Sequence, residues 1–351
     1  MLKSVIIATT LLQVSGAKVL EGDRSTQAIT QEMVELINSK KTTWRAEVST
    51  RFANATVADV KMMLGTVLRG DHGFEEPELE KTVFKSADSD VPVSFDVRTA
   101  WPACAVVTGR VRDQSNCGSC WAFGSTEAFN DRYCISTGDS NTIFSAEDTN
   151  DCCSGIHCGF SNGCNGGQPS GAWKWFTKTG VSSGADYAEV GTGSTCKPYT
   201  LQSCAHHVDP PAGMVSCTEV QSYKTPTCTS TCGESAYGTA YATDKHMASS
   251  TYSVKTAANM QKEIMEKGTV SVAMTVYEDF EAYSGGVYQH VTGSNLGGHA
   301  IKMIGWGVED GTPYWLCVNS WNQSWGEKGL FKILRGSNEC GIEDSVVAGD
   351  V

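Results

Sequence analysis

The sequence lacks the features that mark membrane-spanning, nucleic-acid-binding and repeat proteins. No stretch reaches the roughly 18 consecutive apolar residues that a bilayer span needs. Basic residues are scarce, with 27 Lys and Arg against 39 Asp and Glu, so the net charge of -12 disfavours a nucleic-acid partner and suits an acidic compartment. No period of about 20–50 residues recurs. What remains is a chain of 351 residues, long enough for one large domain or two lobes with real cores.

The first apolar run is short and has the pattern of an export signal. Lys3 precedes the mostly apolar stretch 5–14, and residues 15–17, "SGA", fit a small-x-small cleavage rule. A buried helix or a membrane anchor is the alternative, but the run is too short to span a bilayer. We therefore expect residues 1–17 to be a cleaved signal peptide. The product would enter the secretory pathway and reach a lysosome or vacuole, or the outside of the cell.

Cysteine is absent from residues 18 to about 88, which also contain a single Trp. Apolar residues in this stretch have helical spacing, at Ile29, Met33 and Ile37 and again at Val57, Val60 and Met63. The sequence that follows, "GDHGFEEPELEKTVFKSADSD", is charged and turn-rich like a linker. A helical segment without cysteine, between a signal and a cysteine-rich body, is typical of a propeptide. We predict one at residues 18–89, with a small separate domain as the alternative.

Thirteen of the 15 cysteines lie between Cys104 and Cys232, in a half with helical spacing after Cys120 and in "GAWKWFTKTG". In an exported protein these cysteines can form disulfides, and their odd total leaves at least one thiol unpaired or bonded to another chain. Beyond about residue 250, "TAANMQKEIMEKG" predicts a helix with Thr256 as N-cap and Gly268 past its end. Strand-like runs follow in "VSVAMTV", "GVYQHV", "HAIKMIGWGV", "PYWLCVNSW" and "GLFKILRG". The fold class is therefore α+β, a helical half followed by a β-rich half.

The stretch "QSNCGSCWAF", residues 114–123, could serve three kinds of chemistry. A redox pair of Cys117 and Cys120 needs a βαβ setting, and only the helix is indicated. A zinc site needs four well-spaced ligands, but thiols close together in an oxidising compartment more often form disulfides. The candidate zinc ligands are Cys152, Cys153, His157, Cys158 and Cys164. We favour the third interpretation, a nucleophilic thiol beside a structural disulfide.

A nucleophilic thiol needs a lowered pKa, a base within reach and donors for the developing oxyanion. Cys120 begins a predicted helix, whose dipole favours the thiolate. His299 is one of seven histidines that could be the base, and the two glycines before it let a peptide backbone approach closely. Asn319 could fix the imidazole by accepting from its ring N–H. The Gln114 amide could join the Cys120 backbone N–H in an oxyanion hole.

These motifs, together with "GCNGG" and "NSWNQSWG", resemble those of papain-like cysteine peptidases in order and approximate spacing. The family's nucleophile signature, Cys-Gly-Ser/Ala-Cys-Trp/Tyr, matches Cys117 to Trp121 without a mismatch. A cysteine-rich insertion with adjacent His206 and His207 resembles the occluding loop of the cathepsin B-like branch. The resemblance covers residues 91–349.

The resemblance implies a papain-like two-lobed fold for residues 90–351. The left lobe would be helical, the right lobe β-barrel-like, and the active-site cleft would lie between them, with an occluding loop at about 196–232. It implies no cofactor and no metal site. The implied partners are peptide and protein substrates, the chain's own propeptide as inhibitor and cystatin-like inhibitors, with no nucleic acid and no membrane.

The resemblance also assigns roles to individual residues. Cys120 would be the nucleophile, His299 the general base and acid, Asn319 the residue that orients it, and Gln114 part of the oxyanion hole. The implied substrate-binding residues are Gly166, Gly167, Gly298, Trp321, His206, His207 and Ser345. The implied disulfides are Cys104–Cys134, Cys117–Cys164, Cys152–Cys228, Cys153–Cys158, Cys196–Cys232 and Cys204–Cys217. That leaves Cys120, Cys317 and Cys340 free, which accounts for the odd cysteine count.

The implied activity is peptide-bond hydrolysis through a thiolate–imidazolium pair and an acyl-enzyme. The enzyme would be made as an inactive zymogen and would act as an endopeptidase that also removes dipeptides from C-termini. Two other hypotheses stay open. A non-catalytic homologue would typically lack Cys120 or His299, and both are present. A disulfide oxidoreductase would use Cys117 and Cys120 instead.

Two features depart from the cathepsin B-like pattern. In that branch two ion pairs pin the occluding loop to the body. The pair of His206 with Asp113 can be retained, but the loop lacks the Arg of the second pair, and Ser324 replaces its Asp. We therefore expect a looser loop and relatively more endopeptidase activity. Ser345 stands where an acidic residue accepts basic P2 side chains, so we expect a weaker preference for Arg and a preference for apolar residues at P2.

Overall fold

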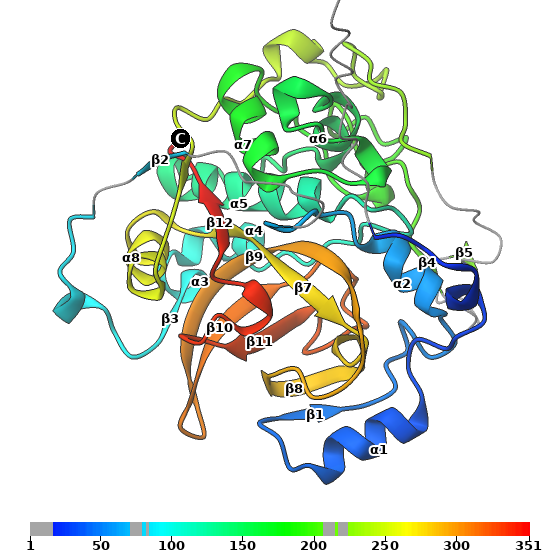
Figure 1. The fold of residues 1–351 in the computed structure, drawn as a ribbon. Helices are drawn as coiled ribbons and strands as arrows, with labels where there is room; N and C mark the ends of the chain where they lie inside the picture. Colours follow the sequence, from blue (N-terminus) through cyan, green and yellow to red (C-terminus); the bar gives the residue numbers. More distant parts are fainter. Residues whose placement is uncertain (1–16, 71–78, 82–83, 206–214, 217–223) are drawn as a thin grey trace, which may run out of the picture.

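The structure, a computed structural model, describes residues 17–70, 79–81, 84–205, 215–216 and 224–351. Its helices are α1 (Gln31–Ser39), α2 (Val57–Met63), α3 (Val97–Ala100), α4 (Ala105–Thr108), α5 (Cys120–Thr137), α6 (Ala146–Cys152), α7 (Pro169–Lys178) and α8 (Ala257–Lys267). Its strands are β1 (Trp44–Ala46), β2 (Glu80–Lys81), β3 (Phe95–Asp96), β4 (Cys204–Ala205), β5 (Val215–Ser216), β6 (Tyr252–Ser253), β7 (Val270–Tyr277), β8 (Tyr283–Tyr288), β9 (Asn295–Glu309), β10 (Thr312–Val318), β11 (Leu330–Leu334) and β12 (Ser345–Ala348). Figure 1 shows two lobes, one with α5, α6 and α7 and the other with the large sheet.

The helical lobe is built around α5, which is buried along almost its whole length. An enclosed helix carries apolar and small residues around its circumference rather than on one face, and Trp121, Ala122 and Phe129 are among its fully buried side chains. The helix ends before Gly138, whose left-handed φ of 79° is what a glycine readily adopts there. Helix α7, with Pro169 in its first turn, packs against α5. The start of α5 is therefore held firmly inside the molecule.

The other lobe is a ten-stranded sheet in the order β1-β8-β11-β10-β9-β7-β12-β6-β2, with β3 attached to β9. The longest strand, β9, lies between β7 and β10 and pairs with both in antiparallel fashion. An aromatic cluster of Phe280, Trp321, Trp325 and Phe331 packs in this lobe, with neighbouring ring centroids 5.0 to 5.8 Å apart. Residues on β9 are therefore held by ladders on both sides.

The sheet does not close, so the expectation of a β-barrel-like lobe is wrong. Its end strands, β1 and β2, both come from the N-terminal region (residues 18–89). In the described part of the chain they pair with β8 and β6 and not with each other. An edge strand leaves N–H and C=O groups unpaired, and a short added strand satisfies them without curling the sheet into a barrel. The N-terminal region thus covers both edges of an open sheet.

The elements predicted from apolar spacing are present, which confirms the α+β class. Thr30 and Thr56 cap α1 and α2 through their side-chain oxygens, although α1 begins two residues after Ile29. Helix α8 has Thr256 at its N-cap and Gly268 past its end, as predicted. The predicted strand-like runs correspond to β7, β8, β9, β10 and β11. Over the described ranges, no helix is both long and apolar enough to cross a bilayer.

Candidate active site

Cys120 and His299 come from different lobes and meet inside the molecule. Cys120 is the first residue of α5, His299 lies on β9 opposite Met274 of β7, and both are fully buried. Burial alone would raise the pKa of Cys120. The charge of His299, with hydrogen bonds from His299, Thr66 and the Ala300 backbone, outweighs burial and brings the pKa of the thiol below its ordinary value. A thiol with a lowered pKa beside an imidazole is suited to nucleophilic attack.

The His299 ring is anchored at one nitrogen and open at the other. Its Nε2 lies 2.8 Å from Oδ1 of Asn319, which also accepts a hydrogen bond from the Ser320 backbone at 2.8 Å. The tautomer follows from this contact, because Oδ1 only accepts and Nε2 must therefore donate. Nδ1 is buried and has no hydrogen bond of ordinary geometry among the described residues. It therefore stays available for proton exchange with the nearby thiol.

Trp321 covers this imidazole. Its ring centroid lies 4.7 Å from that of His299, with 32° between the planes, and the indole is fully buried. Because the indole excludes water from the side it covers, it favours retention of the hydrogen bond between His299 and Asn319.

Gln114 is fixed by three hydrogen bonds. Its Oε1 accepts from Ser320 Oγ at 2.7 Å, which orients the amide. Its Nε2 donates to the carbonyl oxygen of Cys117 at 2.7 Å and to that of Met63 at 2.9 Å. Met63 belongs to the N-terminal region, so a peptide carbonyl of that region already sits on the amide nitrogen expected to bind an oxyanion.

The N-terminal region continues over the thiol. The backbone N–H of Gly65 points to Cys120 Sγ at 3.3 Å, and Thr66 Oγ1 lies 3.4 Å from the same sulfur. The Gly65 carbonyl accepts from Gly167 N–H at 2.7 Å, and Thr66 N–H donates to the Gly298 carbonyl at 3.1 Å. An extended strand is therefore bound through its backbone on both walls of the site.

Close packing at this point requires glycine. A Cβ on Gly65 would lie 1.7 Å from the carbonyl oxygen of Gly118, and one on Gly298 would lie 2.1 Å from that of Thr66. A Cβ on Gly167 would lie 2.4 Å from the Trp121 ring. These contacts leave no room for a side chain, so the two strands approach at backbone distance.

Of the remaining predicted substrate residues, Gly166 and Ser345 lie in the described part of the chain. Gly166 precedes Gly167 with φ of 114°, a value suited to glycine. Ser345 opens β12 and pairs with Ala273 of β7, which in turn pairs with Ala300, so one strand separates it from the residue after His299. His206 and His207 lie outside the described residues.

The cysteine pairing decides between the alternative chemistries. The structure contains the disulfides Cys104–Cys134, Cys117–Cys164, Cys152–Cys228, Cys153–Cys158 and Cys196–Cys232. The sixth expected pair includes Cys217, which is outside the described residues. The free thiols are Cys120, Cys317 and Cys340. Cys117 is thus bonded elsewhere than to Cys120, and the four cysteines of the supposed zinc site are all in disulfides, so neither alternative fits. No group of three or more possible ligands gathers for a metal within the described ranges.

Several contacts of this site were not foreseen from the sequence. Arg51 is buried and donates to the Cys204 carbonyl at 2.5 Å, while its other guanidinium nitrogen lies 3.6 Å from the Asp113 carboxylate. Phe52 packs edge-on against Trp321, with centroids 5.3 Å apart. Asp113 also accepts from the Asn322 amide at 3.2 Å. In this state Arg51 pairs with the Asp113 carboxylate, which was expected to pair with His206.

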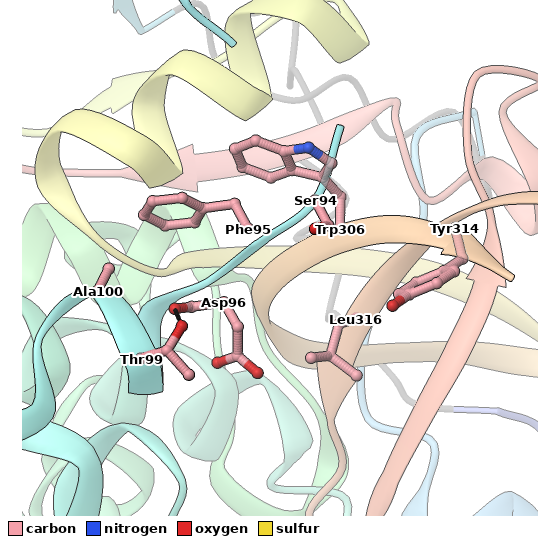
Figure 2. Close-up of a pocket in the computed structure, with 8 residues that line it drawn as sticks. All are labelled: Ser94, Phe95, Asp96, Thr99, Ala100, Trp306, Tyr314 and Leu316. Atoms are coloured by element: carbon pink, nitrogen blue, oxygen red, sulfur yellow. Dashed lines mark hydrogen bonds between the residues drawn. The ribbon is translucent and has the colours of Figure 1, made fainter. Parts of the chain in front are cut away.

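A separate cavity of about 420 Å³ lies on the sheet side, lined by Phe95, Trp306 and Tyr314 among others (Figure 2). Phe95 stacks on Trp306 at 5.1 Å, and the Asp96 carboxylate pairs with Arg98 at 2.6 Å. Its one lining carboxylate is therefore neutralised. The cavity adds no group to the site around Cys120.

Comparisons with known proteins agree with this geometry. Residues 91–349 match the papain family of cysteine proteases, and residues 29–70 match the peptidase family C1 propeptide. The chain is similar to cathepsin B-like cysteine proteinase 4 of Caenorhabditis elegans, with 43% identity over 99% of both chains. It is similar to a cathepsin B-like cysteine proteinase of Schistosoma japonicum, with 42% identity over 92% of this chain and 91% of the other. Among solved structures, procathepsin B S9 from Trypanosoma congolense matches with a TM-score of 0.76 and 31% identity, over 93% of this chain and 99% of that one.

Proposed function

Because the chain belongs to the papain family of cysteine proteases and is similar to cathepsin B-like cysteine proteinases, we propose that Cys120 and His299 are its catalytic pair. His299 Nδ1 would take the proton from Cys120, and the sulfur would attack the carbonyl carbon of the scissile peptide. His299 would then donate the proton to the leaving nitrogen as the carbon–nitrogen bond breaks. Water, deprotonated by His299, would hydrolyse the acyl-enzyme and return the thiol.

The observation that carries this proposal is the burial of Cys120 beside His299, whose imidazole Asn319 anchors at 2.8 Å. The charge of that imidazole lowers the pKa of the thiol, which agrees with the proposal. Gln114 Nε2 and the Cys120 backbone N–H would stabilise the oxyanion. The carbonyl oxygen of Met63 on the same Nε2, at 2.9 Å, supports this role because it is a peptide carbonyl of the same chemical type.

Two experiments test the proposal: trapping of the acyl-enzyme, and removal of the Asn319 side chain that anchors the His299 imidazole. After acid quenching of the processed enzyme with a slowly deacylated peptide ester, mass spectrometry should find the acyl group on the Cys120 peptide. Asn319→Ala should lower kcat/KM by about 10²-fold and alter the pH profile, because the ring loses its anchor. Asn141→Ala, on an exposed turn, is the matched control. Full turnover with Asn319→Ala, or acyl transfer to another residue, would contradict the proposal.

The N-terminal region, residues 18–89, would act as the inhibitory propeptide. Its support is the strand through Met63, Gly65 and Thr66, which covers both the thiol and the oxyanion donor. Processing in an acidic compartment would release it, after a signal peptide at residues 1–17 has routed the chain to a lysosome, vacuole or the outside. Cystatin-like inhibitors would compete for the same vacated site.

Substrate choice would follow from the two departures seen in the sequence. His206 and His207, in a loop at about 196–232, would hold a substrate's C-terminal carboxylate and allow dipeptide removal. With no Arg in that loop and Ser324 exposed, the loop would be looser and endopeptidase activity relatively greater. Strong dominance of dipeptide removal at every pH would contradict this.

Ser345 would weaken any preference for Arg at P2, since a hydroxyl cannot form the charge pair that a carboxylate offers. Two substrates that differ only at P2, one with Arg and one with Phe, test this. Equal turnover of the two would count against the idea.

A further inference from the structure

Glu281 is a buried acid that the proposed mechanism does not use. It lies in a short turn, Phe280–Ala282, between β7 and β8, and is fully buried. Neither carboxyl oxygen accepts a hydrogen bond from another described residue. Burial raises the pKa of Glu281 well above its ordinary value, and the nearby charges of Asp279 and Glu278 raise it further. A buried carboxyl without a partner destabilises the fold that holds it, so its presence needs an explanation other than stability.

The propeptide crosses over this residue. Glu47 donates its backbone N–H to the Ala282 carbonyl at 2.8 Å, and Phe52 packs on Trp321 at 5.3 Å. Phe280 itself contacts Trp321 at 5.7 Å, so residues 47–52 contact the turn at Ala282 and also the Trp321 ring that packs on Phe280. The Ser49 hydroxyl, in the middle of this segment, is also buried without a partner. Removal of the propeptide would therefore uncover the turn that carries Glu281.

The uncovered place is on the leaving-group side of the nucleophile. In the proposed mechanism His299 protonates the leaving nitrogen, so the substrate's C-terminal part runs past His299. Trp321 lies against His299 at 4.7 Å, and Phe280 lies against Trp321. The order away from the sulfur is thus His299, Trp321 and then the turn that carries Glu281.

Negative charge lies close to Glu281, because the Asp279 carboxylate is only two residues away and acts on it electrostatically. A substrate with a basic side chain directly after the scissile bond would give the Glu281 carboxylate the partner that it lacks in the zymogen.

We propose that, in the processed enzyme, Glu281 is a specificity-determining residue that selects Arg or Lys at P1′, the first residue after the scissile bond. The inference rests on the function proposed above, since the position of P1′ is defined by attack of Cys120 and protonation by His299. The selection is electrostatic: once uncovered, the Glu281 carboxylate would pair with a guanidinium or ammonium group.

The experiment uses the full chain, folded as the zymogen and processed in acid. Internally quenched peptides that differ only at P1′, with Arg, Gln or Leu, are compared at pH 6.5, where an exposed carboxyl is ionised. The wild-type enzyme should show kcat/KM about tenfold higher for Arg than for Gln. In Glu281→Gln this ratio should fall to about one, because the shape is kept and the charge is lost. In Glu281→Leu the Arg-to-Gln ratio of kcat/KM should also fall to about one, and kcat/KM for the Leu peptide should rise.

Glu278→Gln is the matched control, because Glu278 lies three residues away and its carboxylate accepts from the Ser294 N–H. This variant should keep the Arg preference. An unchanged Arg-to-Gln ratio in both Glu281 variants, with cleavage intact, overturns the inference and leaves the peptidase proposal standing. Cleavage that survives Cys120→Ala would overturn the peptidase proposal instead.

Discussion

The two lobes hold their halves of the active site by different means. The five disulfides in the described residues all lie between Cys104 and Cys232; Cys117–Cys164 holds the segment just before α5, and Cys104–Cys134 holds the end of α5. Cys317 and Cys340 in the sheet lobe are free. The sheet lobe places His299 through the ladders of β7 and β10 and through aromatic packing. The loops before α5 and α7 have little regular structure, so covalent links replace backbone ladders there. Disulfides therefore fix the geometry of the site in the helical lobe, and backbone hydrogen bonds between strands fix it in the sheet lobe.

Buried charge connects the lobes. Lys302, three residues after His299 on β9, lies 3.0 Å from Asp131 and 3.5 Å from Glu127, both on α5. Ser271 of β7 donates to the Gly124 carbonyl of α5 at 3.1 Å. These contacts fix the distance between the two halves of the site.

The largest expected effect tests whether the lobes act as one unit. Cys120→Ala and His299→Ala should each lower kcat by about 10⁴-fold or more, because each removes one member of the proposed catalytic pair. The double variant should be about as inactive as either single one. Steady-state kinetics on one quenched peptide measures all three, and a much larger loss in the double variant would show independent contributions.

The next prediction separates the two means of support. Removing the Cys117–Cys164 disulfide, whose cysteines are 47 residues apart, with Ala at both positions should lower the free energy of unfolding by about 3 kcal/mol. Cys317→Ala in the sheet lobe should cost only about 1 kcal/mol, since it removes one buried sulfur. Denaturant titrations of the zymogen, in a Cys120→Ala background that prevents self-cleavage, give both values. Equal losses would remove the distinction between the lobes.

A smaller effect is expected where the propeptide meets both lobes. Gly65→Ala should weaken inhibition by the propeptide about tenfold, because its Cβ would lie 1.7 Å from the Gly118 carbonyl oxygen and the strand must shift. The inhibition constant of a separately made propeptide is the measurement. Gly22→Ala, which meets no atom within 4 Å, should leave it unchanged. Tight inhibition by the Gly65 variant would contradict this, because it would mean that the strand can shift without weaker binding.

The last prediction concerns the charges between the lobes, where the effect is a slope of stability with pH. Burial raises the pKa of Glu127 to about 7, although Lys302 and Arg112 oppose the shift. The folded state therefore keeps this proton when the unfolded chain has lost it. The resulting stability is fully present below about pH 4.5 and is lost as the pH rises through about 7, by roughly 3 kcal/mol.

Glu127→Gln should flatten this dependence, because an amide does not titrate. The unfolding temperature of the Cys120→Ala zymogen between pH 4.5 and 7.5 measures it, with the exposed Glu32→Gln as control. The prediction is wrong if the slope persists in the Glu127 variant.

Residues with distinctive side chains were predictable from the sequence, whereas backbone contacts were not. Cys120, His299 and Asn319 stood in recognisable motifs, and apolar spacing located α2, α8 and β7. Strands β1 and β2 have three and two residues, too short for an alternating pattern, so the open sheet was missed. The approach of the Met63 carbonyl to Gln114 depends on the path of the chain and not on a side chain. Glu281 was overlooked because a single acid in a polar turn carries no periodic signal.

The hydrogen that Gly65 presents to Cys120 Sγ has a kinetic consequence. The sulfur faces a donor and not an electrophilic carbon, so the bound strand does not acylate Cys120, and while it stays in place it blocks the access of a small alkylating agent. The rate of haloacetamide labelling at Cys120 would therefore report how fast the propeptide leaves, rather than how reactive the thiol is. Raising the reagent concentration should speed labelling only up to the rate at which the strand leaves.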